Sequence, residues 1–471
     1  MKKIGCIGLI LSLLLASVWF IPAYATEEAL SGPVVNGCHS LDARVPFLGS
    51  RPLVTNARAT VLYEIGSQTL MHAYNADEVM YPASFVKIMT GLIVAERGIM
   101  TEAVTATKEV LDTIPLGAAS TGLEPDEVMT VQDLLYCMIV GSANDAAAVL
   151  AHHISGSQSA FVEEMNRYAA ELGCTATNFT NPHGLHDPEQ VITARDAARI
   201  LEAAYKNELF ADAYGTVYHT VPATNKSGVR NLISGNYLLN GKDGPEIYYD
   251  ARVVGSRTGT TEDDERCVAS VAKTDDLELI CIVMGSKSEY TENAGQFVVI
   301  GGYYETSDLI DQCEGFAARQ ILYAGQALRQ YSVVNGSADV VVGPKESMST
   351  VLPADIMAES LTYRYQEISG ALEAPIEKGA LISTLEIWHN SSCVAEVDLF
   401  AMNSVPVQQM LGDEVQQQGG GEALKIALYV VAILLGLAVV FVLIVRFVHW
   451  MRKIARRNRS RRYRRSRRRS R

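Results

Sequence analysis

The segment Tyr81-Pro82-Ala83-Ser84-Phe85-Val86-Lys87 holds the pattern on which the fold assignment depends. A helical pattern runs over residues 84–97, so Ser84 and Lys87 share one face of a predicted helix. A serine hydroxyl is a weak nucleophile that needs a neighbouring base, and a lysine one turn away can serve when burial lowers its pKa. Free backbone N–H groups at the helix start can also hold a developing oxyanion. Alone, this pattern more often marks a helix cap beside a solvated lysine.

Two further motifs follow in a fixed order. Ser142-Ala143-Asn144 lies in a break between predicted helices at residues 131–138 and 145–153. Arg257-Thr258-Gly259 comes just before a predicted hairpin over residues 267–284. The motifs S-x-x-K, S-D-N and K-T-G together mark class A β-lactamases and penicillin-binding proteins. The chain has this order, with S-A-N and R-T-G as variants, and the ordered triple is far more specific than any one motif.

Composition excludes several other classes of protein. The 471 residues are 48% hydrophobic and 20% charged, which excludes a disordered chain and a small disulfide scaffold. The formal net charge of −13 hides an asymmetry, because residues 446–471 hold 14 basic and no acidic side chains. Residues 26–445 carry 24 basic and 53 acidic side chains, a net charge of −29. Such a body repels phosphate, so no nucleic-acid partner is expected.

The two ends of the chain predict its location. Residues 1–25 read as a signal peptide, with two lysines, an apolar run and the small-x-small site Ala23-Tyr24-Ala25; a retained anchor is the alternative. Residues 426–445 are 20 residues without a charge, which is about 30 Å of helix and enough to cross a bilayer. Basic residues follow at once, and these stay on the cytoplasmic side. We therefore expect a single-pass protein of the bacterial cell membrane, with an extracytoplasmic body and a tail held by anionic lipid.

Between these ends the pattern changes twice. A mixed α and β domain covers the larger part and ends in a predicted helix at residues 316–330, after which short β-rich runs indicate a small all-β domain. A Gln- and Gly-rich stretch then predicts a flexible stalk. The predicted boundaries are a lead-in at 26–56, the mixed domain at 57–330, the all-β domain at 331–405, the stalk at 406–425, the transmembrane helix at 426–445 and the basic tail at 446–471.

Cysteine spacing gives little evidence of disulfides. Seven cysteines remain after the signal peptide, and no C-x-x-C pair occurs. A tight turn at Asp275-Asp276 would pair Ser270 with Cys281, which places Cys267 on the opposite face of the sheet. We expect no bond between Cys267 and Cys281, and we expect most of these thiols to be small buried hydrophobes.

With these motifs in view, the chain resembles the low-molecular-weight penicillin-binding proteins that act as D-alanyl-D-alanine carboxypeptidases. The resemblance covers about residues 57–405. It implies an α+β fold of the β-lactamase/transpeptidase type, in which an antiparallel sheet is flanked by helices and joined to a helical subdomain, followed by a small all-β domain. The segments that carry it, besides the three motifs, are Asn144-Asp145-Ala146-Ala147, Met165-Asn166, Asn181-Pro182-His183-Gly184-Leu185, Thr193-Ala194-Arg195-Asp196 and Ala374-Pro375-Ile376-Glu377-Lys378-Gly379.

The resemblance also implies residue roles. Ser84 attacks the carbonyl between the last two D-alanines of a peptidoglycan stem peptide, and Lys87 takes the serine proton. Ser142 bonds to Lys87 and relays a proton to the leaving D-alanine. Penicillins and other β-lactams acylate Ser84, and neither a cofactor nor a metal is expected. The implied substrate-binding residues are Asn144, Arg257, Thr258, Gly259 and Thr260, with the backbone N–H groups of Ser84 and Thr260 forming the oxyanion hole.

The chain departs from the family pattern at two places. Arg257 stands where the family normally has lysine; arginine keeps the charge and can grip a carboxylate with two hydrogen bonds. With a pKa above about 12, it does not readily exchange a proton. Thr260-Thr261 stand where an aromatic residue or histidine often follows, which favours an altered substrate preference.

Two other functions stay open on the sequence alone. A serine β-lactamase uses the same chemistry with fast deacylation, for which Glu189 is the nearest candidate to the required glutamate. A membrane-tethered peptidoglycan-binding protein with a weakened site is the second alternative. Asp196 reads as a structural acid at a helix start rather than a catalytic base.

Overall fold

The computed structural model describes residues 41–42, 47–48, 51–54, 56–261, 263, 265–290, 298–357, 360–366, 368, 370–389, 392–408 and 411–466. The predicted signal peptide lies outside these residues. The chain divides into two compact units. The first comprises Met1–Arg329, Val341–Ser369 and Gly379–Met402, and the second comprises Gln330–Val340, Gly370–Lys378 and Asn403–Arg471.

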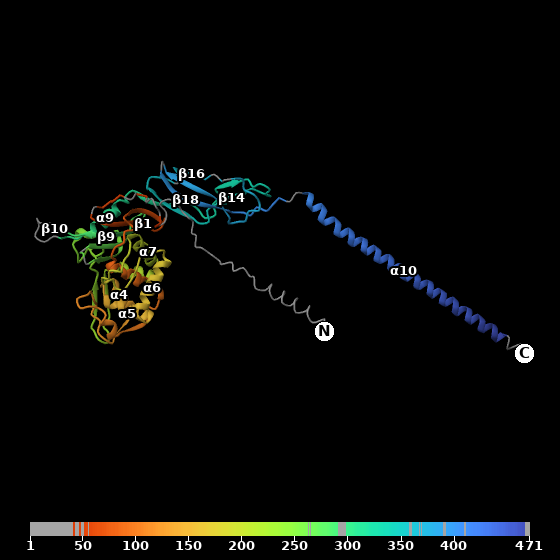
Figure 1. The fold of residues 1–471 in the computed structure, drawn as a ribbon, viewed down its shortest axis with the longest axis horizontal. Helices are drawn as coiled ribbons and strands as arrows, with labels where there is room; N and C mark the ends of the chain where they lie inside the picture. The colour runs from red at the N-terminus through yellow and green to blue at the C-terminus, as the bar shows by residue number, and fades with distance from the viewer. Residues whose placement is uncertain are drawn as a thin grey trace, which may run out of the picture. The chain divides into compact units, whose positions relative to one another are not determined.

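The first unit is built on a five-stranded antiparallel sheet in the order β2-β1-β9-β8-β7 (Figure 1). The strands are β1 (Ala59–Glu64), β2 (Thr69–Tyr74), β7 (Val253–Thr260), β8 (Glu265–Lys273) and β9 (Glu278–Lys287). The predicted hairpin over residues 267–284 is confirmed, and Ser270 pairs with Cys281 as the turn predicted. Strand β7 is an edge strand, so its outer side is free of sheet pairing.

The sheet separates two hydrophobic cores, because side chains alternate between its faces. Val61 and Ile280 join the core that the helices share, whereas Leu62 and Val283 join a smaller core. Cys267 belongs to the first core and Cys281 to the second, which confirms that they point to opposite faces. The cysteines in the described part of the chain, Cys137, Cys174, Cys267, Cys281, Cys313 and Cys393, are free thiols, and all but Cys393 are buried.

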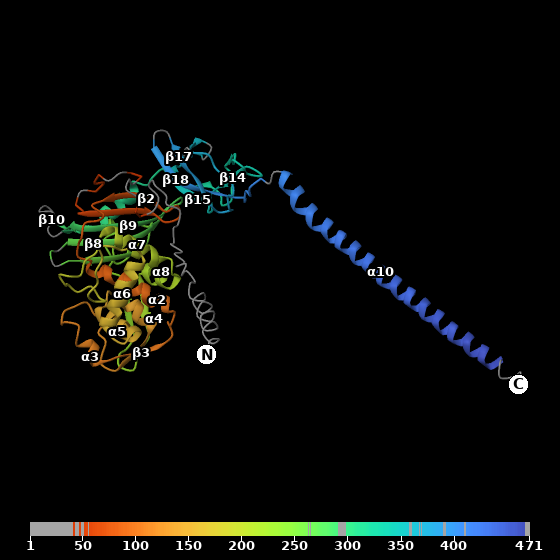
Figure 2. The same cartoon turned by 45° about the vertical axis from the view of Figure 1, so that its right-hand side comes forward.

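The described part of the first unit contains eight α-helices. They are α2 (Val86–Arg97), α3 (Lys108–Leu111), α4 (Val131–Ile139), α5 (Asn144–Ser155), α6 (Gln158–Glu171), α7 (Ala194–Tyr205), α8 (Glu208–Gly215) and α9 (Tyr303–Asp311). Helix α9 packs into the smaller core, and α2, α4, α5 and α6 lie together on the other side (Figure 2). The helices predicted at residues 84–97, 131–138 and 145–153 are confirmed, to within two residues at their starts.

Helix boundaries follow local chemistry. The Thr130 and Thr193 hydroxyls accept hydrogen bonds from backbone N–H groups of the first turns of α4 and α7. Helix α2 ends at Gly98, whose φ of 66° is left-handed and suits glycine. The remaining short elements are η1 (Ala83–Phe85), η2 (Glu246–Tyr248), β3 (Ala103–Ala106), β4 (Glu127–Thr130), β5 (Tyr218–Val221), β6 (Arg230–Ile233), β10 (Glu289–Tyr290) and β11 (Val298–Val299).

The helix predicted at residues 316–330 is wrong. This stretch forms β12 (Phe316–Leu322) and β13 (Arg329–Tyr331). Its Ala, Gln, Leu and Arg residues favour a helix locally, but β12 pairs antiparallel with β15 (Met348–Pro353) over six residue pairs. Tertiary pairing overrides such weak propensities. Strand β15 was not predicted, because no sequence pattern indicated that residues 348–353 pair with β12.

The other β-rich runs form strands as predicted. Strands β14 (Val340–Gly343), β18 (Ser392–Ala401), β17 (Leu381–His389) and β16 (Thr362–Tyr365) are neighbours in this order. The α+β fold with an all-β part towards the C-terminus is therefore confirmed. The Leu385 and Leu399 side chains are fully buried, as expected for strands with one face in a core.

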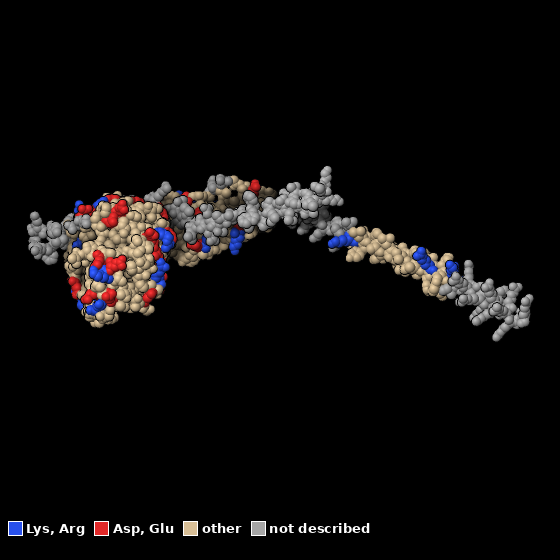
Figure 3. All heavy atoms as spheres, turned by 60° about the horizontal axis from the view of Figure 1, so that its bottom comes forward, with Lys and Arg blue, Asp and Glu red and all other residues tan. Residues whose placement is uncertain are grey.

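The second unit contains short bridges and one long helix. Val334 bridges to Glu373 and Ile376 to Val405, and α10 (Leu411–Ser466) follows. The stretch expected to be a flexible stalk differs from that expectation, since it is helical from Leu411; helix propagation adds a hydrogen bond per residue and carries the helix across its glycines. Residues 425–453 of α10 are long and apolar enough to cross a membrane. Figure 3 shows Lys and Arg near both ends of this apolar stretch.

Candidate active site

Ser84 and Lys87 lie together where η1 passes into α2. The Ser84 side chain is half-buried, and Lys87 is 1% exposed. Lys87 Nζ lies 3.4 Å from Ser84 Oγ, as the three-residue spacing predicted. The residue before the serine, Ala83, has a φ of 45°, a left-handed conformation that costs a non-glycine residue energy.

The Lys87 amine is held by two acceptors besides the serine. It donates to Asn144 Oδ1 at 2.6 Å and to the His183 carbonyl. Burial holds the pKa of Lys87 well below its ordinary value, the Arg257 cation lowers that pKa further, and the Asp145 carboxylate opposes both effects. The lysine therefore gives up its proton far more easily than a solvated lysine.

The S-A-N motif turns sharply before α5. Ser142 has a φ of 59°, the second left-handed non-glycine residue in the site. Asn144 is 5% exposed, and its backbone N–H donates to the Ala119 carbonyl at 2.8 Å. The resemblance implied a bond from Ser142 to Lys87. Instead, among the described contacts, the Ser142 hydroxyl accepts from Arg257 Nη2 at 2.6 Å.

Arg257 lies on β7 and is 5% exposed. Its guanidinium also donates to the Ile139 carbonyl, while Nε is buried without a hydrogen-bond partner. Burial lowers the pKa of Arg257 to about 10, so the side chain stays a cation near neutral pH. The guanidinium thus fixes the Ser142 hydroxyl and keeps a positive charge at the inner end of the site.

Strand β7 passes directly over Ser84. A Cβ added at Gly259 would lie 3.1 Å from the Ser84 backbone nitrogen and 3.0 Å from the Ala83 Cβ. A side chain at this position would therefore push the strand away from η1. Thr258 is half-buried and Thr260 is exposed, so the edge of β7 beside Ser84 is open to an extended ligand.

The loop at residues 181–190 closes the other side of Lys87. Thr90 Oγ1 donates to the Pro182 carbonyl at 2.7 Å, and Asn181 Oδ1 accepts from the Gly184 N–H at 2.7 Å. These bonds hold the His183 carbonyl against Lys87. The imidazole of His183 is itself buried, which lowers its pKa to about 3 and keeps the ring neutral.

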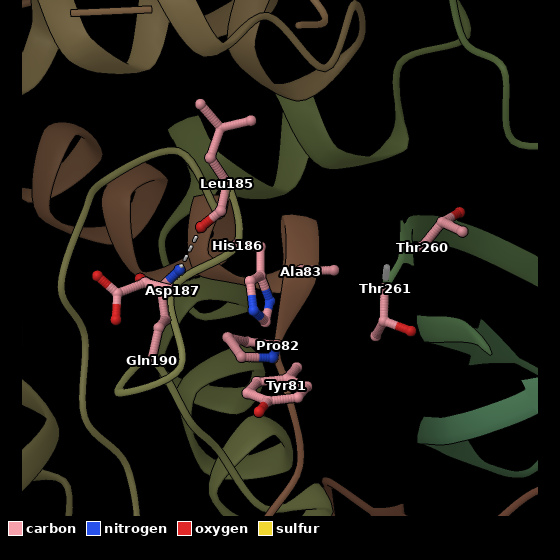
Figure 4. Close-up of a pocket in the computed structure, with 10 residues that line it drawn as sticks. Tyr81, Pro82, Ala83, Leu185, His186, Asp187, Gln190, Thr260 and Thr261 are labelled. Atoms are coloured by element: carbon pink, nitrogen blue, oxygen red, sulfur yellow. Dashed lines mark hydrogen bonds between the residues drawn. The ribbon is translucent and has the colours of Figure 1, made fainter. Parts of the chain in front are cut away.

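A pocket of about 240 Å³ adjoins the serine. Figure 4 shows Thr260 and Thr261 across this pocket from Ala83, Pro82 and His186. The Tyr81 and His186 rings meet edge to face, with centroids 4.8 Å apart. Small threonines thus face an aromatic wall at the position where the family resemblance led us to expect a larger side chain on the strand.

The structure brings all the sequence-predicted site residues together: Ser84, Lys87, Ser142, Asn144, Arg257, Thr258, Gly259 and Thr260. The sequence analysis did not identify the His183 carbonyl as a partner of Lys87, because a backbone carbonyl has no side-chain motif. It also missed the contact between Arg257 and Ser142. Asp196 is a structural acid as predicted, because its carboxylate accepts from Ala176 N and Thr177 Oγ1 at the start of α7.

Comparison with known proteins agrees with this geometry. The family model described as D-alanyl-D-alanine carboxypeptidase, Peptidase_S11, matches residues 48–288, which is more than half of the chain. The chain belongs to this family. A second model, the penicillin-binding protein 5 C-terminal domain, matches residues 316–407 and so begins at β12.

Individual relatives extend over most of this S11 family member. It is 28% identical to D-alanyl-D-alanine carboxypeptidase DacC of Escherichia coli, covering 74% of this chain and 84% of the relative. It is 29% identical to the carboxypeptidase DacA of Haemophilus influenzae, covering 80% and 92%. Penicillin-binding protein 5 from Haemophilus influenzae has a solved structure with a TM-score of 0.63 at 28% identity, covering 76% of this chain and 100% of that one.

Proposed function

We propose that this chain is a membrane-anchored serine D-alanyl-D-alanine carboxypeptidase that removes the terminal D-alanine from peptidoglycan stem pentapeptides. One observation carries the proposal: a fully buried lysine amine contacts the hydroxyl of a serine at a helix start, 3.4 Å away. Membership in the S11 family agrees with this chemistry.

The hydrogen bonds of Lys87 support its role as the base. A neutral amine has two N–H groups and one lone pair. Asn144 Oδ1 and the His183 carbonyl can only accept, so they take the two N–H groups. The lone pair then faces Ser84 Oγ and can take the hydroxyl proton as the oxygen attacks the peptide carbonyl.

In this proposal, Ser142 takes part in completing acylation. As the bond from Ser84 Oγ to the carbonyl carbon forms, the peptide C–N bond breaks and the leaving amine needs a proton. We propose that the proton on Lys87 reaches that amine through the Ser142 hydroxyl, which accepts a hydrogen bond from Arg257. The family resemblance, rather than a contact among the described residues, supplies the step from Lys87 to Ser142. Arg257 and Thr258 also bind the carboxylate of the leaving D-alanine.

The backbone N–H groups of Ser84 and Thr260 stabilise the tetrahedral oxyanion. Water then attacks the acyl-enzyme, and Lys87 serves again as the base. Gly259 allows the close approach of β7 to Ser84 on which this oxyanion site depends. A penicillin would enter in place of the dipeptide and acylate Ser84.

The full-length chain, solubilised in detergent, tests this proposal. A fluorescent penicillin should label it, mass spectrometry should map the adduct to Ser84, and the chain should release D-alanine from a synthetic stem pentapeptide. The Ser84→Ala chain should neither be labelled by the penicillin nor release D-alanine. A labelled chain that releases no D-alanine would support the weakened peptidoglycan-binding protein instead.

The β-lactamase alternative needs a glutamate that activates water at the acyl-enzyme. Glu189 is exposed and does not line the pocket beside Ser84, which disfavours that role. A penicilloyl adduct that persists for many turnovers of the pentapeptide would exclude the lactamase; rapid release of penicilloic acid would support it.

We also propose that residues 426–445, within the apolar segment 425–453 of α10, cross the membrane once, with the body outside the cytoplasm. The basic tail that follows then lies on the cytoplasmic side, where anionic lipids hold it. The distribution of charge supports this orientation, since the acidic residues all lie N-terminal to the apolar segment.

A further inference from the structure

Asp145 is a buried carboxylate at the edge of the active site that the proposed mechanism does not use. It lies in the first turn of α5, next to Asn144, and is 3% exposed. Four donors surround its carboxylate: Ser120 Oγ at 2.6 Å, Thr121 N at 3.1 Å, Leu123 N at 3.0 Å and Ala146 N at 2.9 Å. A negative charge is well accommodated here, because three N–H groups and a helix N-terminus face it.

These bonds join a loop to the catalytic turn. The loop at residues 119–123 is held at Ser120, Thr121 and Leu123 by the one carboxylate. The same loop accepts the Asn144 backbone N–H through the Ala119 carbonyl at 2.8 Å. Asn144 in turn accepts from Lys87, so Asp145 fixes the residue that orients the lysine.

The titratable groups around Lys87 lie on three elements. Arg257 on β7 is a buried cation, Asp145 on α5 is an anion, and the neutral His183 imidazole lies on the loop at residues 181–190. Arg257 lowers the pKa of Lys87 and Asp145 raises it. Removal of either charge should therefore change the pH at which Lys87 loses its proton, in opposite directions.

We propose that Asp145 is a positioning residue that holds the loop at residues 119–123 against the S-A-N turn. Its negative charge also offsets the effect of the Arg257 cation on the Lys87 amine. Its charge keeps the lysine basic enough to take the Ser84 proton within a cleft that already contains a buried arginine. This inference rests on the proposed function, in which Lys87 is the base for acylation.

The test is the pH dependence of acylation by a penicillin, measured as a second-order rate constant on the full-length chain in detergent. Acylation requires neutral Lys87, so its rate rises with pH until the lysine is deprotonated. Asp145→Asn should move this acid limb to lower pH by about one pH unit. It should also lower the plateau rate, since a weaker base takes the serine proton less readily. Arg257→Gln should move the limb to higher pH.

Two controls separate charge from structure. Ser120→Ala removes a donor to the carboxylate without a change of charge, and should leave the acid limb in place. Asp196→Asn removes a buried carboxylate that holds a different loop at the start of α7, and should lower the melting temperature without moving the limb. If Asp145→Asn does not fold, Asp145→Ser keeps a side-chain oxygen in the first turn of α5 and should show the same shift.

The outcomes distinguish this inference from the proposed function. If the parent chain is not acylated at Ser84, the proposed function fails. If the parent is acylated and a folded Asp145 variant keeps the parent's acid limb, the inference about Asp145 is wrong. A shift to higher pH would overturn it equally, since it would mean that the carboxylate does not favour protonated Lys87.

Discussion

In the proposed mechanism, the reactivity of Ser84 depends on the environment of a single amine. Lys87 is buried to 1% exposure and lies near a second cation, so its pKa falls far enough for it to act as a base. We expect Lys87→Ala to lower the rate of penicillin acylation by about 10³-fold, the middle of the range for loss of a general base. Gel fluorescence of the labelled chain measures this rate.

Lys108→Ala is the matched control for that substitution. Lys108 is an exposed lysine whose ion pair with Asp112 lies on the surface of α3, and its loss should leave acylation unchanged. Labelling that persists in a folded Lys87→Ala chain would refute the assignment of the base.

The role of Arg257 is either to supply a positive charge or to exchange a proton during turnover. Its pKa of about 10 keeps it protonated near neutral pH. We expect Arg257→Lys to equal or exceed the parent in turnover of the pentapeptide, since lysine keeps the charge and can also exchange a proton. Arg257→Gln should raise KM, because the substrate carboxylate loses its cation.

Steady-state kinetics on the pentapeptide decides between these roles. A fall in turnover of more than about tenfold in Arg257→Lys would contradict the expectation. It would show that the guanidinium is needed to bond the Ile139 carbonyl and the Ser142 hydroxyl together.

At residue scale, helix geometry predicted only the local contacts of the site, and the ordered motifs predicted its distant members. Ser84 and Lys87 are three residues apart, so helix geometry alone places them together. The bonds from Lys87 to Asn144 and to the His183 carbonyl span 57 and 96 residues. Side-chain motifs can flag Asn144, but a backbone carbonyl has no sequence signature, and the choice of Arg257 as the partner of Ser142 follows from packing.

At the scale of elements, the loop at residues 181–190 shows how backbone conformation fixes the site. Gly184 has a φ of 84°, and a Cβ there would lie 2.1 Å from the Ala83 carbonyl oxygen. We expect Gly184→Ala to lower the free energy of unfolding by about 2 to 3 kcal/mol. Acylation should fall as well, because the shifted loop no longer holds the His183 carbonyl against Lys87.

Gly156→Ala provides the comparison, since Gly156 also has a left-handed φ, of 77°, at the end of α5 but has open space around its Cβ position. It should cost only about 1 kcal/mol from backbone strain and leave acylation unchanged. Thermal unfolding and penicillin labelling measure both effects. Equal losses of activity in the two variants would contradict a specific role for the loop.

Helices were predicted correctly where the spacing of apolar residues and a capping residue indicated the same helix start. Helix α4 has a threonine cap and a buried apolar face, and its predicted start at Val131 is confirmed. Strand β12 failed because its Ala-, Gln- and Arg-containing sequence favours a helix, while the pairing with β15 that decides its structure lies about 30 residues further along the chain.

At the scale of the whole molecule, charge divides the chain into regions. Residues 26–445 carry a net charge of −29, and residues 446–471 hold 14 basic side chains without an acidic one. An apolar helical segment at 425–453 separates these regions. The positive side of such a segment stays in the cytoplasm, and anionic lipid headgroups add to that preference.

This arrangement predicts which protease sites are reachable from each side of the membrane. The arginine-rich tail is an excellent trypsin substrate, but it should survive trypsin added to sealed right-side-out vesicles, because the bilayer shields it. In inside-out vesicles the tail should be removed while penicillin labelling of Ser84 is protected from an impermeant probe. An antibody against residues 454–471 reports the tail, and detergent permeabilisation serves as the control by exposing both sites in either preparation. Loss of the tail epitope in sealed right-side-out vesicles would reverse the orientation, and a serine on the cytoplasmic side could not reach the cell wall on which its proposed chemistry acts.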